Sequence, residues 1–325
     1  MIRAETVLKE LRQLWADLGK SETTGGGVLR ACAMTLIVAD EYHADESRQN
    51  AGEILGELMH EHPSRAIVIR QQPGADLEAR VFAQCWMPFG KRQQICCEQI
   101  EITAAPERMQ EVPNSVLALM APDLPVILWC RGPQWFDAVG YNDLLALADK
   151  TIFDSTLLTD TARGLARLRV LRSTGSRVAD LAWTRLTLWR EMIAQAWSDG
   201  SLREVTAGEY HMRVVHPGSL RTAGACYLTA WLEKSLTSRP VELAFEDRES
   251  IAGICSVRFE SAHGHVDITV NGGALELWSK GNSVRMPEPP HTEYELMREE
   301  LGILDRDPRF EEALSRAADL AAHSH

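Results

Sequence analysis

Residues 28–70 read VLRACAMTLIVADEYHADESRQNAGEILGELMHEHPSRAIVIR, and the pattern within them decides the fold class. Residues 28–40 form a near-continuous run of β-type side chains, as expected for a strand that is covered on both faces. Residues 46–60 repeat apolar side chains at helical spacing, and residues 65–70 are a second strand-like run. A strand, a helix and a strand in this order favour parallel pairing through a right-handed crossover.

The same alternation continues towards residue 174. The pattern predicts a hairpin of two strands, then alternating helices and strands, at residues 77–86, 94–103, 112–120, 124–130, 142–148, 151–153 and 159–171. We therefore expect a Rossmann-like, three-layer α/β domain with a mostly parallel sheet over residues 1–174. The polar run STGS at residues 173–176 marks the expected boundary.

After residue 175 the pattern changes to an α+β domain, expected over residues 175–325. Most of its strands are separated by tight Gly-containing turns, which point to antiparallel hairpins. The expected strands are residues 210–216, 241–246, 254–261, 265–271 and 274–278, with a possible edge strand at 284–286. The expected helices are residues 220–235, 292–301 and 308–322.

Residues 179–195, ADLAWTRLTLWREMIAQ, predict a helix whose apolar surface is unusually wide. Trp183 and Trp189 lie in the apolar arc, and so do Arg185 and Arg190. A buried guanidinium must be paired and hydrogen-bonded. The helix therefore either joins the two domains through arginine–carboxylate contacts or offers tryptophan and arginine anchors to another protein. The sequence leaves both interpretations open.

The composition limits the partners that this chain can have. With 325 residues, 45% of them hydrophobic and 25% charged, the chain can fill two ordinary cores. A net charge of −12 disfavours general binding to nucleic acid or to an anionic membrane. The start is charged and amphipathic, and no run of about 18 apolar residues occurs. These features predict a cytoplasmic protein without a membrane-spanning helix.

A local basic region stands out in this acidic chain. Residues 160–195 contain seven arginines, among them Arg163 and Arg167, against Asp160, Asp180 and Glu191. These arginines either form solvated helix faces and ion pairs between domains or make a docking surface for an acidic partner or for phosphate-bearing ligands.

Seven cysteines, an odd number, lie mostly in strand-like runs. Free cysteine in such runs behaves as a small buried hydrophobe, so we expect reduced, packed and inert thiols. The string ICCEQI at residues 95–100 contains two of them, Cys96 and Cys97, which must point to opposite faces of a strand. Glu98 and Gln99 follow within the same apolar run and must find hydrogen-bond partners.

No string in the sequence requires a catalytic or cofactor site. Neither a Walker loop nor a GxGxxG after a strand is present, and the histidine pairs do not have metal-ligand spacing, so we expect no cofactor and no metal. Asp154 and Ser155 end a predicted strand, where open parallel sheets bind ligands. The same two residues are also a good helix-start signal. No set of nucleophile, base and orienting residue is evident.

Several strings together resemble the OpcA family, the glucose-6-phosphate dehydrogenase assembly proteins of bacteria. The matching strings are RAC at residues 30–32, ICCEQI at 95–100, VP at 112–113, PDLPV with Trp129 at 122–129, DKTIFDS at 149–155, and DLAWTRLT with WR at 180–190. They stretch across the first two thirds of the chain. The last third matches mainly in length and layout.

The resemblance implies a non-catalytic protein that binds oligomeric glucose-6-phosphate dehydrogenase, an enzyme of the oxidative pentose phosphate pathway. The protein would act as an assembly factor and allosteric activator of that enzyme. The anchors expected first are Trp183, Arg185, Trp189 and Arg190, and the next are Arg163 and Arg167. The alternative function is an enzyme or sensor that binds a nucleotide or sugar phosphate near Asp154 and Ser155.

Overall fold

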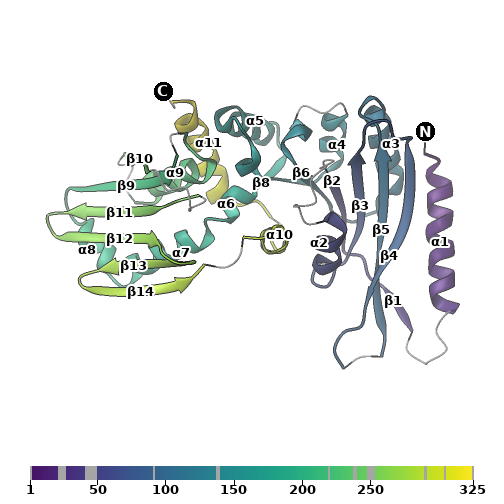
Figure 1. Ribbon diagram of the computed structural model, residues 1–325, viewed down its shortest axis with the longest axis horizontal. Coiled ribbons are helices and arrows are strands. Elements are labelled where there is room, and N and C mark those ends of the chain that lie inside the picture. Colours follow the sequence, from purple (N-terminus) through teal and green to yellow (C-terminus); the bar gives the residue numbers. More distant parts are fainter. Residues whose placement is uncertain are drawn as a thin grey trace. The chain divides into compact units, whose positions relative to one another are not determined.

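Figure 1 shows the computed structural model, which describes residues 2–20, 27–40, 50–90, 92–136, 140–218, 220–236, 240–246, 253–288, 291–303 and 305–323. The chain forms two compact units. Unit 1 comprises residues 1–154, 176–179 and 297–302, and unit 2 comprises residues 155–175, 180–296 and 303–325.

Unit 1 is built on an 8-stranded sheet, here called sheet A, in the order β1-β5-β3-β2-β6-β7-β8 with β4 paired to β5. Its strands are β1 (Val28–Arg30), β2 (Met34–Asp40), β3 (Ser64–Gln71), β4 (Glu78–Trp86), β5 (Gln94–Ala104), β6 (Val126–Arg131), β7 (Lys150–Phe153) and β8 (Arg177–Asp180). The strands β1, β5, β3, β2, β6 and β7 run parallel, and β4 is antiparallel to β5. The central strand β2 is buried along its whole length, as a strand covered on both faces must be.

Helices cover both faces of sheet A. They are α1 (Ala4–Lys20), α2 (Ala51–Leu58), α3 (Val112–Leu119) and α4 (Tyr141–Leu147), with short 3₁₀ turns η1 (Pro106–Glu111) and η2 (Pro133–Phe136). Trp15 of α1 bonds to Glu98 of β5, whereas Gly52 of α2 lies against Gln99. Because neighbouring residues of a strand point to opposite faces, α1 and α2 cover opposite faces of the sheet.

Unit 2 contains a 6-stranded sheet, sheet B, in the order β10-β9-β11-β12-β13-β14. Its strands are β9 (Tyr210–Pro217), β10 (Glu242–Glu246), β11 (Ser256–Ser261), β12 (Gly264–Val270), β13 (Ala274–Ser279) and β14 (Asn282–Pro287). Along β9, buried and more exposed residues alternate, which is the pattern of a sheet with one face on the core. Met212, Val214 and Phe259 lie in that core.

The helices of unit 2 are α5 (Thr161–Ser173), α6 (Leu181–Thr184), α7 (Thr187–Ser198), α8 (Ser201–Val205), α9 (Ala223–Leu236) and α11 (Pro308–Ala322), with the 3₁₀ turn η3 (Ser155–Leu157). Helix α10 (Glu293–Leu301) is divided, with residues 293–296 in unit 2 and residues 297–301 in unit 1. Helix α11 packs against both α5 and α9. Helices α5, α6 and α11 begin at aspartates whose carboxylates accept backbone N–H groups of the first turn: Asp160, Asp180 and Asp307.

The predicted fold class is confirmed: an α/β part with a mostly parallel sheet precedes a part with a mostly antiparallel sheet. The predicted domain boundary at residues 174 and 175 stays a prediction. Of the predicted helix at residues 46–60, residues 46–49 lie outside the described residues, and α2 accounts for most of the rest.

The single strand predicted at residues 28–40 is wrong, since two strands, β1 and β2, occupy this range. β1 pairs with β5, whereas β2 pairs with β3 and β6. Between them, Ala31 N donates to Cys96 O and Ala33 N donates to Pro63 O. These non-local hydrogen bonds lead the chain from its pairing with β5 to its pairing with β3 and β6. The local run of β-type residues does not predict them.

The single helix predicted at residues 179–195 is also wrong. Ala179 and Asp180 end strand β8, and the helical part is divided into α6 and α7. Asp180 is extended and accepts a hydrogen bond from Ala182 N, so the helix begins one residue later. The expectation of antiparallel pairing also fails at one edge of sheet B, because β10 runs parallel to β9.

Candidate functional site

The order of the strands in sheet A reverses between β2 and β6. The chain first adds β3 and β5 on one side of β2 and then places β6 and β7 on the other. Open parallel sheets bind ligands outside the carboxyl ends of the strands at such a switch point. The side chains at this edge are therefore the first candidates for a functional site.

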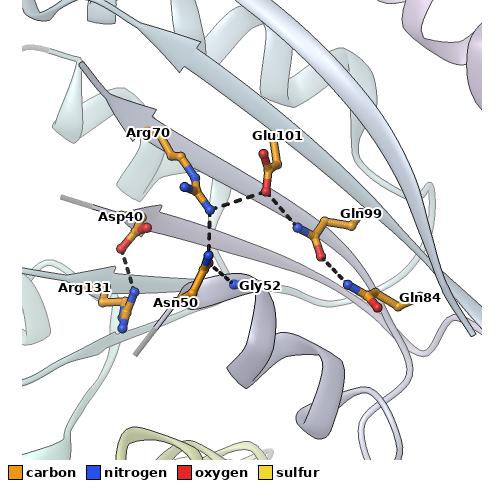
Figure 2. A network of polar contacts seen from close by, with 8 residues as sticks. All are labelled: Asp40, Asn50, Gly52, Arg70, Gln84, Gln99, Glu101 and Arg131. Atoms are coloured by element: carbon orange, nitrogen blue, oxygen red, sulfur yellow. Dashed lines mark hydrogen bonds and ion pairs between the residues drawn. The ribbon is translucent and has the colours of Figure 1, made fainter. Parts of the chain in front are cut away.

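An ion pair bridges the switch point (Figure 2). Asp40 is the last residue of β2, Arg131 is the last residue of β6, and the two lie opposite each other on these adjacent strands. Arg131 Nη1 donates to Asp40 Oδ1 at 3.0 Å, and the two residues are 3% and 8% exposed. A buried guanidinium and a buried carboxylate are each costly alone, so each stabilises the other here.

A chain of polar side chains extends from this edge to the outer strand β4 (Figure 2). Arg70, near the end of β3, donates from Nη2 to Asn50 Oδ1 at 3.3 Å and pairs with Glu101 Oε1 at 3.4 Å. Gln99 Nε2 donates to Glu101 Oε1 at 3.0 Å, and Gln84 Nε2 donates to Gln99 Oε1 at 3.4 Å. These groups bond to one another and link α2 to three strands of the sheet.

Glu98 is the centre of a second polar cluster, on the opposite face. Its carboxylate accepts from Trp15 Nε1 at 2.5 Å and Arg65 Nε at 2.7 Å, and it pairs with Arg30 Nη2 at 2.8 Å. The Arg30 guanidinium also lies over the Trp15 ring, 5.5 Å from its centroid. Glu98 is 3% exposed. The expected need of Glu98 for partners is thus met by α1, β1 and β3.

A disulfide joins Cys85 of β4 to Cys96 of β5. The prediction that all seven thiols are reduced is therefore wrong for this pair. The antiparallel register places the two residues opposite each other, with their Cα atoms 4.1 Å apart, and the sequence alone does not reveal this register. Cys97 points to the other face and is buried, and burial raises the pKa of its thiol to about 11.

The DLAWTRLT string begins with Asp180, which is 1% exposed. Its Oδ1 accepts from Ser155 N at 2.9 Å and from Ala182 N at 3.0 Å, and its Oδ2 accepts from the Tyr227 hydroxyl at 2.8 Å. Burial, with the neighbouring Asp180 charge, raises the pKa of Tyr227 well above its ordinary value. Asp180 thus ties η3, α6 and α9 together within unit 2.

The predicted anchor Trp183 lies in an aromatic cluster of unit 2. Its ring centroid is 6.1 Å from that of Tyr227 and 6.0 Å from that of Phe310, and its Nε1 donates to Asp307 Oδ2 at 2.9 Å. The Arg190 guanidinium lies 3.9 Å from the Trp183 ring centroid, and its Nη1 donates to Trp183 O at 2.7 Å. Trp183 is 5% exposed. Its contacts with Arg190 connect α6 to α7 across the break between the two helices.

The other predicted anchors differ in exposure. Trp189 is buried, Arg185 and Arg167 are half-buried, and Arg163 on α5 is exposed. Two further arginines of the basic region pair with carboxylates of α11: Arg169 with Asp319 at 2.6 Å and Arg172 with Glu311 at 3.0 Å. Helix α11 therefore neutralises part of the basic region within unit 2.

The residues of the alternative ligand site are both buried. Asp154 is 8% exposed at the end of β7, and Ser155 is 1% exposed in η3. The Ser155 hydroxyl has no hydrogen-bond partner among the described residues. A ligand site near these two residues stays a prediction.

Two features are absent from the described part of the chain. No group of three or more His, Cys, Asp or Glu side chains there could hold a metal ion. No helix among those residues is long and apolar enough to cross a membrane.

Sequence reasoning missed the ion pair at the switch point. Asp40 and Arg131 each end a long apolar run, and a charged residue in that position was the available signal. The carboxyl ends of neighbouring parallel strands meet at one edge, but the strand order that makes β2 and β6 neighbours had to be known first.

Solved structures with a similar arrangement are distant. The aldose-aldose oxidoreductase of Caulobacter crescentus has a TM-score of 0.48 at 11% identity, over 89% of this chain and 97% of that chain. The biliverdin reductase of Synechocystis sp. has a TM-score of 0.45 at 11% identity, over 93% and 99% of the two chains. These likenesses are too weak to inform the chemistry of this chain.

Curated relatives carry the name OxPP cycle protein OpcA. The protein of Nostoc punctiforme is 28% identical over 193 residues, which are 58% of this chain and 41% of the relative. The protein of Synechococcus elongatus is 26% identical over 244 residues, which are 74% and 50%. The chain thus spans about two fifths to one half of the length of the curated relatives it matches.

Two family models match consecutive parts of the chain. Residues 56–170 match the OpcA model described as glucose-6-phosphate dehydrogenase subunit N-terminal domain, and residues 176–314 match the corresponding C-terminal domain. Because the two models together cover residues 56–314 apart from residues 171–175, the protein belongs to the OpcA family.

Proposed function

We propose that this protein binds glucose-6-phosphate dehydrogenase, promotes the assembly of its oligomer and raises its activity, without catalysing a reaction of its own. The observation that carries this proposal is the match of both family models, each described by that dehydrogenase, to consecutive parts of the chain. The curated relatives, named for the OxPP cycle, point to the same metabolic context.

The buried polar clusters favour a structural role for their carboxylates over a catalytic one. Asp40, Glu98 and Asp180 are buried, and each accepts hydrogen bonds from groups of the chain itself. A catalytic acid or base needs to reach a substrate, whereas these carboxylates hold segments of the fold together. The burial of Asp154 and Ser155 likewise favours a structural role over the alternative of a nucleotide or sugar-phosphate site.

We place the docking surface, within this proposal, on the arginines of α5 and of the segment that runs from the end of α6 into α7. Arg163 and Arg167 on α5 reach the surface most readily, and Arg185 is half-buried at the break between α6 and α7. Trp183 and Trp189 are buried, and the Arg190 guanidinium stacks on the Trp183 ring, so these three residues help to hold this region in place. An acidic patch on the dehydrogenase would complement these guanidinium groups.

Activation requires a difference in affinity. The protein must bind the active, assembled dehydrogenase more tightly than the inactive form, and the coupling free energy is typically about 1–3 kcal/mol. The stack of Arg190 on Trp183 holds the segment around Arg185 in one conformation, so that little entropy is lost when Arg185 binds.

The direct test mixes the purified protein with the dehydrogenase of the same organism. We expect co-elution on size exclusion and a changed kcat or KM for glucose 6-phosphate. With no complex and no kinetic change, the proposal fails. The purified protein alone should show no oxidation of glucose 6-phosphate, and turnover by it would exclude a purely non-catalytic role.

A further inference from the structure

A doubly wound sheet with this strand order is a common scaffold for binding a dinucleotide. In such proteins the pyrophosphate lies at the N-terminus of the helix that follows the first strand, and glycines let the backbone approach it. The corresponding position here is the N-terminus of α2, which follows β2. The fit of the residues at this position to a dinucleotide can be tested from their contacts.

The first turn of α2 is capped by the protein itself. Asn50 Oδ1 accepts from Gly52 N at 2.9 Å and from Arg70 Nη2 at 3.3 Å (Figure 2). An ideal Cβ built on Gly52 would lie 3.4 Å from Asn50 Oδ1 and 3.7 Å from Gln99 Nε2. Asn50 and Gln99 thus line this turn at ordinary contact distance, and the amide of Gly52 already has an acceptor.

The sequence between β2 and α2 has the wrong chemistry for a phosphate cradle. Residues 41–49 read EYHADESRQ, with no glycine and with Glu41, Asp45 and Glu46. A loop that binds pyrophosphate needs glycine for close approach and gains nothing from carboxylates, which repel the phosphates.

The switch point itself holds an ion pair. The Asp40 carboxylate ends β2 and is bound to Arg131, so the one guanidinium at the end of β6 faces a carboxylate of the chain. Arg70 lies near the end of β3, where an arginine can hold the 2′-phosphate of NADP. Its Nη2, however, is bound to Asn50 and Glu101.

We infer that the Asp40–Arg131 ion pair and the capped α2 take the place of a dinucleotide, so that unit 1 has the scaffold of a coenzyme-binding domain but does not bind a nicotinamide coenzyme. One consequence rests on the proposed function: activation of the dehydrogenase proceeds through surface contact, not through delivery of coenzyme.

The test uses the purified full chain without the dehydrogenase, so its outcome is independent of the proposed function. The fluorescence of NADPH should stay the same when the protein is added. NADPH at about 1 mM should leave the melting temperature of the protein unchanged, whereas a ligand that binds the folded state and is present in large excess over its Kd would raise it. Saturable binding of NADPH or NADP⁺ with a rise in melting temperature would overturn the inference.

A second measurement tests the role of the ion pair. Asp40→Ala removes the carboxylate from buried Arg131, and we expect the melting temperature to fall by on the order of 10 °C. Inorganic phosphate should then restore part of that loss saturably, because an anion can replace the carboxylate. Asp40→Asn, which keeps the shape of the side chain, serves if Asp40→Ala does not fold.

The matched control is Glu61→Ala, which removes a carboxylate from the exposed pair with Arg298 in the same unit. This variant should unfold like the wild type and respond to phosphate no differently from it. If the Asp40 variants are as stable as the wild type and insensitive to phosphate, the ion pair does not fill the switch point and the inference is wrong.

Discussion

Single buried carboxylates hold this fold together where distant segments meet. Glu98 accepts from Trp15, 83 residues away, and from Arg65, 33 residues away. In the same unit, Glu300 accepts from buried Lys150 across 150 residues. The sequence shows that Glu98 needs partners, because it lies in an apolar run, but the partners belong to elements whose positions depend on the whole fold.

The Glu98 cluster predicts a large effect of one substitution. Glu98→Gln leaves two arginines and an indole without their shared carboxylate, so we expect a loss of about 3–5 kcal/mol in the free energy of unfolding. Urea denaturation measures this loss. Glu78→Gln, which breaks the exposed pair with Arg80 in the same sheet, should cost less than about 1 kcal/mol. Similar losses in the two variants would contradict the role of Glu98.

Buried thiols predict a fall in stability at alkaline pH. Burial raises the pKa of Cys130 and of Cys226 to about 12, whereas an unfolded thiol ionises near 9.0. A raised pKa in the folded state stabilises the fold below pH 9, and this contribution is lost as the pH rises from 9 towards 12. Each thiol adds a slope of up to about 1.4 kcal/mol per pH unit.

Urea denaturation from about pH 8 to about pH 10.5, a range that spans the pKa of the unfolded thiol, measures this slope. Cys130→Ala should reduce it. Leu128→Ala, a core truncation on the same strand without a thiol, should keep the wild-type slope, and an equal slope in all three proteins would contradict the prediction.

Most helices and strands could be predicted from periodicity, and the failures lie where long-range bonds redirect the chain. Helix α11 coincides with the predicted range, and β3 with its buried side chains extends the predicted strand by one residue at each end. The run at residues 28–40 divides into β1 and β2 because Cys96 and Pro63 supply acceptors that lie far away in sequence. The β4–β5 hairpin was predicted, but its disulfide depended on a register that the sequence does not display.

The disulfide leads to a test of that register. In denaturant without reductant, the five free cysteines should react with a thiol reagent, and all seven should react after reduction. In Cys85→Ala, which frees Cys96, reduction should add no further reactive thiol. Seven reactive thiols in the unreduced wild type would show that Cys85 and Cys96 are not bonded.

The molecule as a whole combines a net charge of −12 with a basic region on unit 2. Arg169 and Arg172 of this region pair with carboxylates of α11. On the same helix α5, Arg163 is exposed and Arg167 is half-buried. A localised positive patch on an acidic protein can orient an acidic partner, and such steering weakens as salt screens it.

The proposed docking surface predicts a salt-dependent complex. Arg163→Glu together with Arg167→Glu should weaken binding to glucose-6-phosphate dehydrogenase by about tenfold or more, mainly at low salt. Titration calorimetry at two salt concentrations measures the Kd. Arg203→Glu, an exposed charge reversal on α8, is the matched control and should have a small effect. If the double variant binds like the control, the dehydrogenase docks elsewhere.

The sequence by itself determined the fold class, the positions of most helices and strands, and the resemblance to a family, because periodicity and specific strings are local properties of the chain. Only the tertiary structure decided which strands are neighbours, and with that the Asp40–Arg131 pair, the partners of Glu98 and the disulfide. It also placed Trp183 in a core, although an apolar arc with tryptophan and arginine suited an exposed anchor equally well. These features depend on contacts between residues far apart in the sequence, which no local pattern specifies.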